Sequence, residues 1–322
     1  MARYGMTIPI GGIPLHQHER VFKSMIDWGY TDFWSSESDG TDGFTPLALA
    51  AAWTPTARLG IAIIPAYTRG PGVMAMTVAA MAESAPGRFV MGLGTSSDII
   101  VERWNDIAFE RPYYKTRDML RFLRKALTGE RIEEEYDTFK VRGFRLSRGA
   151  PDPQPKILIA ALRSGMLRLA GKEGDGAILN WLSAEDVRTV APYVHEGGPG
   201  KEIAARIFVM PSSDRDKVYA GAKRACAAYL NVPVYAAFHD WLGRRELLSP
   251  MWEAWRAGDR KKALELVPDE VVDDLILWGR PEECRDKVQR YVENGVDTPA
   301  LALMGAGPDV LETIRLLSPS AA

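Results

Sequence analysis

The sequence contains few side chains of the kinds that carry out nucleophilic or metal-dependent catalysis. Its only histidines and cysteines are His16, His18, His195, His239, Cys226 and Cys284. There is no Cys-x-x-Cys pair, no cluster with metal-ligand spacing and no assembly of serine, histidine and aspartate. The start of a surface helix explains His16 and His18 as well as a catalytic role does. The sequence therefore predicts no metal site and no catalytic triad.

One carboxylate has a position suited to chemistry. Glu37 lies in Ser-Ser-Glu-Ser-Asp-Gly, directly after an apolar segment that reads as a strand. A carboxylate at a strand end can donate or accept a proton, or accept hydrogen bonds from a cofactor ring. It can equally cap a neighbouring loop. Glu37 is the candidate catalytic residue, with the structural role as its alternative.

Three other strand ends carry groups that could bind a ligand. Small and hydroxyl residues after one strand allow a ligand to approach the backbone, and Asn180 after another can hydrogen-bond a ligand or merely satisfy its loop. A third strand leads into a helix, whose free N–H groups and positive dipole end suit a phosphate. Arg163 adds charge there, whereas Ser164 can equally be only an N-cap. The candidate ligand contacts are Gly94, Thr95, Ser96, Ser97, Ala160, Ala161, Leu162, Arg163, Ser164, Gly165 and Asn180.

These segments belong to an alternation of apolar strands and helices along the chain. We expect strands at residues 3–10, 32–37, 59–65, 89–95, 156–162, 176–181, 206–211 and 300–304. We expect helices at 15–28, 45–53, 73–82, 113–127, 166–172, 184–194, 214–230, 281–294 and 309–317. Eight such repeats predict an α/β fold, the closed (β/α)8 TIM barrel, whose active site lies at the carboxyl ends of its strands. An open doubly wound sheet is the alternative, but its usual glycine-rich first turn is missing.

Two segments interrupt the alternation. Residues 133–146 alternate apolar and polar side chains around a glycine, which predicts a β-hairpin insertion. Residues 232–274 are helical in pattern and contain Trp241, Trp252 and Trp255. No linker divides the chain, so we expect residues 1–322 to form a single domain with these two insertions.

Two of the expected helices, at residues 44–53 and 73–82, carry almost no charge on any face. A helix that is apolar all round is buried on both sides. Either an insertion covers them or they form the interface of a homodimer, which is the reading that we favour.

Charge and hydropathy limit the remaining partners. The chain of 322 residues has a formal net charge of −2 and no long basic run, which argues against nucleic acid. No segment approaches the roughly 18 apolar residues of a membrane span, and the N-terminus does not resemble a signal peptide. We expect a cytoplasmic protein that acts on a small molecule.

Taken together, the strand ends resemble those of the luciferase-like monooxygenase superfamily, in the branch that uses the deazaflavin coenzyme F420. The markers are Trp-Ser-Ser-Glu at 34–37, Leu-Gly-Ile-Ala-Ile-Ile-Pro at 59–65, Tyr-Thr-Arg at 67–69, the run from 87 to 97, Gly-Asp-Gly-Ala-Ile-Leu-Asn at 174–180 and Gly-Arg-Pro-Glu-Glu at 279–283. The Tyr-Thr-Arg stretch is similar to that of methylenetetrahydromethanopterin reductases. A further stretch at 101–105 resembles actinobacterial relatives.

The resemblance implies roles for several residues. It places a bulge with a non-prolyl cis peptide at Ala62 and Ile63, behind the cofactor ring, and the cofactor phosphate at residues 160–165. Residues 94–98 would line the cofactor, residues 232–274 would form part of a substrate lid, and the two apolar helices would pair in a dimer. Arg69, Arg103 and Arg163 would suit the anionic tail of F420.

The chain departs from the resemblance at one place. Sugar-phosphate and secondary-alcohol dehydrogenases of this branch carry an Asp-His pair where this chain has Glu37 and Ser38. The missing histidine base argues against alcohol oxidation by their mechanism. The sequence therefore predicts an F420-dependent oxidoreductase of unidentified substrate. An FMN-dependent monooxygenase and a cofactor-free, non-catalytic barrel are the alternatives.

Overall fold

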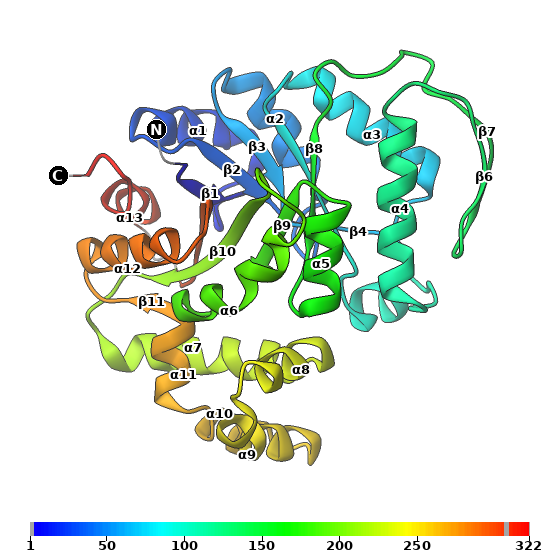
Figure 1. Ribbon diagram of the computed structural model, residues 1–322. Coiled ribbons are helices and arrows are strands. Elements are labelled where there is room, and N and C mark those ends of the chain that lie inside the picture. The colour runs from blue at the N-terminus through cyan, green and yellow to red at the C-terminus, as the bar shows by residue number, and fades with distance from the viewer. Residues whose placement is uncertain (1–2, 306–308, 322) are drawn as a thin grey trace.

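The computed structural model describes residues 3–305 and 309–321, and eight of its parallel strands close into a barrel (Figure 1). The strands pair in the ring order β1, β2, β3, β5, β8, β9, β10 and β12, and β12 pairs with β1. The predicted TIM barrel is therefore confirmed. The strands are β1 (Gly5–Thr7), β2 (Asp32–Ser35), β3 (Arg58–Ile61), β5 (Phe89–Gly94), β8 (Lys156–Ala160), β9 (Gly176–Asn180), β10 (Glu202–Met210) and β12 (Thr298–Leu303).

Helices surround this barrel because each buries an apolar face against the sheet. Two helices lack polar faces altogether, α2 and α3, and both contain apolar residues on the side turned away from the barrel. The surrounding helices are α1 (His18–Asp27), preceded by the 3-10 turn η1 (Leu15–Gln17), α2 (Thr45–Trp53), α3 (Pro71–Ser84), α4 (Pro112–Ala126), α5 (Ser164–Lys172), α6 (Ala184–His195), α7 (Arg215–Leu230), α12 (Pro281–Glu293) and α13 (Val310–Leu316), with a short π-helix η2 (Ile99–Arg103) before α4.

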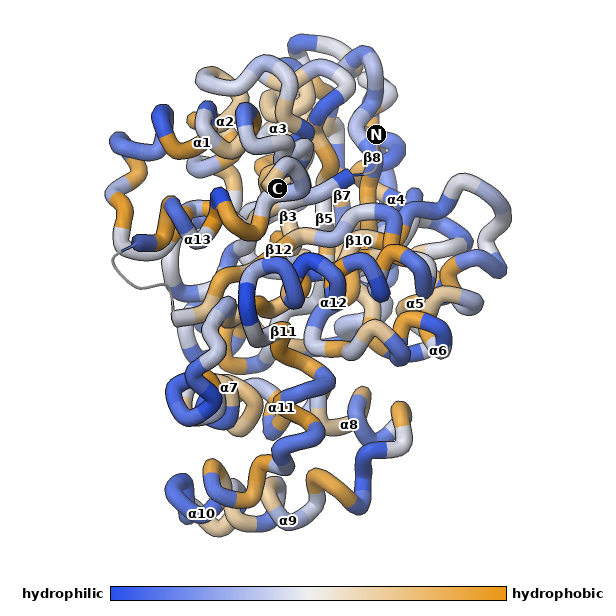
Figure 2. Tube along the Cα trace, turned by 90° about the vertical axis from the view of Figure 1, so that its left-hand side faces the viewer, coloured by the Kyte–Doolittle hydropathy of each residue, from blue (hydrophilic) through white to orange (hydrophobic). Residues whose placement is uncertain are grey.

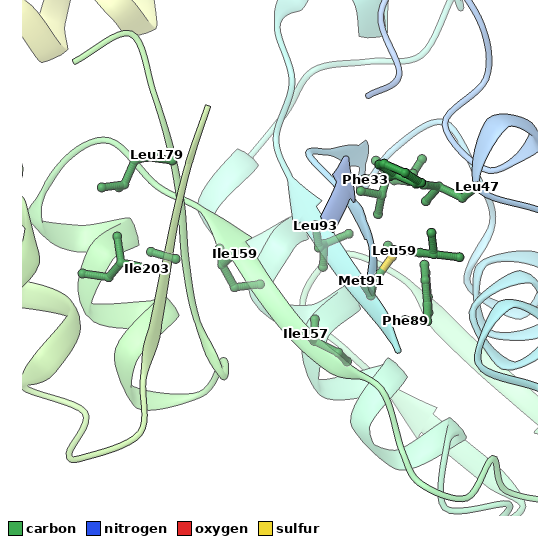
Figure 3. Close-up of a cluster of buried hydrophobic side chains, with 14 of the residues drawn as sticks. Phe33, Leu47, Leu59, Phe89, Met91, Leu93, Ile157, Ile159, Leu179 and Ile203 are labelled. Atoms are coloured by element: carbon green, nitrogen blue, oxygen red, sulfur yellow. The ribbon is translucent and has the colours of Figure 1, made fainter. Parts of the chain in front are cut away.

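The strands bury both of their faces, as expected for a parallel barrel. Outward side chains such as Phe33 and Leu59 pack with Leu47 of α2 between the sheet and the helices (Figure 3). Inward side chains form a separate cluster around Trp34. Gly60 makes room for this tryptophan, since a Cβ at residue 60 would lie 2.4 Å from the Trp34 ring.

The third strand is interrupted at the carboxyl end, as the resemblance predicted. β3 ends at Ile61, and the chain resumes as β4 (Ile64–Pro65), which pairs with Leu93 and Gly94 of β5. The peptide bond between Ala62 and Ile63 is cis. The interruption is anchored by two backbone hydrogen bonds, from Ala62 N–H to Ser35 O at 2.7 Å and from Glu37 N–H to Ile63 O at 3.3 Å.

Besides the interrupted third strand, two predicted strands differ from the structure by three or more residues at one end, and one strand was not predicted. β1 covers only residues 5–7 of the predicted 3–10, because Pro9 has no N–H to donate to a ladder. β10 begins at Glu202, four residues before the predicted start. The short strand β11 (Ile276–Trp278) was not predicted, and it pairs with residues 208–210 of β10.

Both interrupting segments contain regular structure. The strands β6 (Ile132–Glu135) and β7 (Lys140–Phe144) form an antiparallel hairpin beside α4 (Figure 1). Four helices precede β11 and project from one side of the barrel, with α9 and α10 farthest from it (Figure 2). They are α8 (Pro233–Trp241), α9 (Arg245–Arg256), α10 (Arg260–Glu265) and α11 (Asp269–Leu275). Their apolar residues pack with α7 and Phe208 in a cluster of their own.

Candidate active site

A cavity of about 790 Å³ opens at the carboxyl ends of the barrel strands. Its walls come from the ends of β2, β5, β8 and β9, from the interruption after β3, and from the middle of β10. Helix α8 of the helical insertion adds Pro233, Val234, Tyr235 and Trp241 to the wall. The cavity is therefore shared between the barrel and its insertion.

Thirteen of the fourteen residues predicted for the site line this cavity. They are Glu37, Ala62, Ile63, Thr95, Ser96, Ser97, Ala160, Ala161, Leu162, Arg163, Ser164, Gly165 and Asn180. The exception is Gly94, which is buried behind the wall. A Cβ there would lie 2.8 Å from Ala160 Cβ and 3.0 Å from the Ile63 side chain, so this glycine serves the packing of two wall segments.

The turn from β8 to α5 presents free backbone donors to the cavity. The first backbone hydrogen bond of α5 runs from Leu167 N–H to Arg163 O at 3.0 Å. The N–H groups of Ser164, Gly165 and Met166 precede that bond, so the helix offers them no acceptor. All three residues line the cavity, and a Cβ on Gly165 would meet nothing within 4 Å. Together with the exposed Arg163 side chain, this turn has the donors and the charge to hold a phosphate.

The turn after β5, the strand that pairs with β8, adds hydroxyl groups to the adjacent part of the wall. Ser96 adopts a φ of 62°, in the left-handed region that residues other than glycine seldom occupy. Ser97 Oγ accepts a hydrogen bond from Ile100 N–H at 3.4 Å, and Thr95 Oγ1 donates to Ser96 O at 3.2 Å. A backbone held in such a conformation is typical of ligand sites.

The carboxylate of Glu37 is fully engaged by protein donors. It forms a bidentate ion pair with Arg69, with N–O distances of 2.6 and 2.7 Å. Gly43 N–H donates to it at 3.2 Å and Thr68 Oγ1 at 3.3 Å. A carboxylate accepts about four hydrogen bonds, so this geometry favours fixing the loops after β2 and β4 over proton transfer.

Two polar residues of the cavity wall were not predicted. Arg206 lies in the middle of β10 and Tyr235 in α8, and both line the cavity beside Asn180. Asn180 Nδ2 donates to the Tyr235 hydroxyl at 2.9 Å. Burial raises the pKa of Tyr235 to about 12, so its hydroxyl stays protonated at neutral pH. The available signal was one charged residue in the apolar run Ala-Ala-Arg-Ile-Phe at 204–208, which the late predicted start of this strand concealed.

Other sequence candidates lie outside the cavity or are already paired. His18 is buried, where it contacts Pro14 O through Nδ1 at 3.0 Å and accepts from Ile10 N–H through Nε2 at 2.9 Å. It therefore holds the first loop in place and is not the surface residue that we considered. Arg103 is exposed and does not line the cavity, and Arg69 is occupied by Glu37.

Two further features of the described residues bear on the kind of site. Within residues 3–305 and 309–321, no group of three or more histidine, cysteine, aspartate or glutamate side chains is placed to hold a metal ion. Over the same residues, no helix combines the length and apolarity needed to cross a membrane.

The closed (β/α)8 barrel and the large cavity at the carboxyl ends of its strands are typical of proteins that bind a small organic ligand. Residues 3–298 match the model of the luciferase-like monooxygenase family, and the chain belongs to that family. A 5,10-methylenetetrahydromethanopterin reductase of Methanolobus tindarius is 26% identical to it, over 90% of each chain.

Solved structures show the same fold. A coenzyme F420-dependent tetrahydromethanopterin reductase from Methanopyrus kandleri matches with a TM-score of 0.79 and 21% identity, covering 99% of this chain and 98% of that one. The oxygenating constituent of 3,6-diketocamphane monooxygenase of Pseudomonas putida, in complex with FMN, matches with a TM-score of 0.68 and 17% identity, covering 100% and 98%.

Proposed function

We propose that this protein is an F420-dependent oxidoreductase that transfers hydride between the deazaflavin and a small organic substrate. The observation that carries the proposal is the turn from β8 to α5, where three unpaired N–H groups and Arg163 meet at the cavity. Support for F420 over other phosphate-bearing cofactors comes from the structurally similar reductase of Methanopyrus kandleri, which is described as dependent on coenzyme F420.

The residues present fit such a cofactor. The turn at residues 160–165 would hold the phosphate, and Ala62 and Ile63 would support the ring from the interruption after β3. Thr95, Ser96, Ser97 and Asn180 would contact the chain or the ring edge. When bound, F420 supplies a carbon centre that accepts or donates hydride, and the protein supplies position and electrostatics.

The remaining wall residues would shape the reaction space. The ion pair between Glu37 and Arg69 fixes the loops beside the interruption after β3. Pro233, Val234 and Trp241 of α8 cover the cavity with apolar surface, which excludes water from the reacting groups. Glu37 remains our proposed catalytic candidate, although its engaged carboxylate makes positioning the better supported role.

Cofactor titration tests the proposal directly. Purified protein should bind F420 more tightly than FMN, and Arg163→Ala should weaken F420 binding about ten-fold or more, because a charge-assisted hydrogen bond contributes about 1.5–3 kcal/mol. The wild type should also show the steeper loss of affinity with salt. The matched control is Arg103→Ala, which removes an exposed arginine outside the cavity wall and should leave the affinity for F420 unchanged.

Two outcomes would replace the proposal. Preference for FMN, with turnover of dioxygen by reduced FMN, would make the protein a flavin-dependent monooxygenase. That candidate is favoured by the fold shared with the FMN complex from Pseudomonas putida. Binding of neither cofactor would point to a non-catalytic barrel.

A further inference from the structure

Arg206 is a half-buried cation without a counter-ion in the part of the chain that the structure describes. It lies within an apolar strand, and its Nε is buried without a hydrogen-bond acceptor. The cavity wall contains two acidic residues, Glu37 and Asp98, and neither forms an ion pair with it. Burying an unpaired charge is costly, so a protein that retains one generally pairs it with a ligand.

The surroundings of Arg206 are aromatic. Its guanidinium carbon lies 5.0 Å from the centre of the Phe208 ring, and Tyr229 and Tyr235 line the same cavity. Burial lowers the pKa of Arg206, and the two phenols oppose this only in part. A guanidinium remains charged even so, because its ordinary pKa lies far above neutrality. The cavity wall therefore has a positive charge at Arg206 that attracts an anion.

Tyr235 supplies a second donor at the same place. Its oxygen accepts the hydrogen bond from Asn180 Nδ2, which leaves the hydroxyl hydrogen free to donate. Asn180 pairs in register with Arg206 across the β9 and β10 strands, so the amide positions the hydroxyl beside the guanidinium. No other hydrogen bond of the Tyr235 hydroxyl occurs among residues 3–305 and 309–321.

We propose that Arg206 and Tyr235 bind the carboxylate of an organic acid substrate. The planar guanidinium matches a carboxylate in shape, and its single charge balances a monoanion better than a phosphate dianion. This assignment names the substrate class of the proposed oxidoreductase. It rests on the proposed function for the claim that the bound acid is a substrate. The turn at residues 160–165, where we propose the cofactor phosphate, differs from this pair because its donors are backbone N–H groups at the start of a helix.

The same cation could instead meet an anionic oxygen of the reduced cofactor ring. Arg206 shares a small pocket with Ala62 of the interruption after β3, and it shares the large cavity with Tyr235 of α8. We favour the substrate because Tyr235, the second donor, belongs to the helical insertion and not to the strand ends. The experiment separates the two sources by measuring acid binding and cofactor binding on the same variants.

Calorimetric titration with benzoate and its neutral isostere benzamide tests the proposal, both with and without saturating F420. Benzoate should bind the wild type at least ten-fold more tightly than benzamide. Arg206→Met should lower benzoate affinity at least ten-fold, Arg206→Lys should restore part of it, and Tyr235→Phe should weaken it by a smaller factor. The control is Arg103→Met, which should bind benzoate like the wild type. Near-ultraviolet circular dichroism checks that each variant is folded.

Equal binding of benzoate and benzamide, or unchanged benzoate binding by folded Arg206→Met, would overturn the proposal. So would a loss of F420 affinity in Arg206→Met without a loss of benzoate affinity, which would assign the residue to the cofactor. Failure of the wild type to bind F420 would instead contradict the proposed function, and the benzoate comparison would still decide whether Arg206 and Tyr235 form a carboxylate site.

Discussion

Glu37 and Arg69 form an ion pair in the cavity wall, with side chains only 15% and 20% exposed. Arg69 also lies 5.0 Å above the ring of Phe44, at the start of α2. The pair thus joins the loop after β2, the loop after β4 and the entry to a helix. At the scale of single residues, Glu37 therefore stabilises the cavity wall through an ion pair, although its position at a strand end suggested proton transfer.

Glu37→Gln distinguishes these roles. Because both carboxylate oxygens accept from Arg69, we expect the substitution to lower the free energy of unfolding by about 1–3 kcal/mol, measured by urea denaturation at neutral pH. Asp98→Asn is the matched control, since Asp98 also lines the cavity and forms no ion pair within the described residues. A large loss of turnover at unchanged stability would show instead that Glu37 is catalytic.

At the scale of elements, a buried charge network closes the end of the barrel opposite the cavity. Arg58 of β3 pairs with Glu202 of β10 through N–O distances of 2.6 and 2.8 Å, and it contacts Asp32 of β2 at 3.3 Å. Thr298 of β12 and Lys156 of β8 also donate to Glu202. Five strands therefore meet at one set of charges at their amino ends.

This network predicts a loss of stability in acid. Burial acts to raise the pKa of Glu202, but Arg58 and Lys156 outweigh it and lower the value to about 2 from an ordinary 4.5. A lowered carboxyl pKa stabilises the fold above about pH 4.5, and this contribution is lost as pH falls towards 2. The difference corresponds to about 3 kcal/mol in the free energy of unfolding.

Urea denaturation between pH 7 and pH 3 measures this effect. Glu202→Gln should be less stable than the wild type by about 3–5 kcal/mol at pH 7, and the gap should narrow as the pH falls. Glu312→Gln is the control, because its partner Arg315 is exposed on α13 and the pair should contribute nothing measurable. A gap that is independent of pH would contradict the prediction.

The regular alternation of apolar segments was sufficient to predict the barrel. The helix at 45–53 matches α2 at both ends, and the strand at 89–95 differs from β5 by one residue. The three residues of β11 were not recognisable, because they directly follow α11 and are too few to show a period. Arg206 was missed because the predicted strand began only at this residue, and Tyr235 was missed because it reaches the cavity only after the insertion folds over the barrel.

At the scale of the whole molecule, α2 and α3 leave an apolar surface uncovered. Ala48 and Ala52 of α2 are exposed, as are Ala80 and, at 52% each, Val73 and Met76 of α3. The sequence indicated that these helices are apolar all round, but only the structure shows which residues face outward. We propose that this surface is the interface of a homodimer, since contiguous exposed apolar patches mark protein interfaces.

The double substitution Ala52→Glu with Met76→Glu tests the dimer. Both residues are exposed, so the chain should stay folded, while two buried charges per subunit should dissociate the pair. Sedimentation velocity should show a wild-type dimer and a monomeric variant at equal concentration. Leu311→Glu, on the exposed side of α13, should leave the dimer intact. A wild type that sediments as a monomer at every concentration would refute the interface.

One strand joins the two halves of this architecture. β10 pairs with β9 along residues 202–206 and with β11 along residues 208–210, so the chain leaves this strand, forms the five helices α7 to α11 and returns to the same strand. Both ends of the insertion are thereby fixed, whatever lies between them. Evolution could lengthen, shorten or exchange the segment from α8 to α11 without changing the register of the barrel. Such changes would alter the part of the cavity wall that α8 supplies, while the strand ends on the other side of the cavity stay the same.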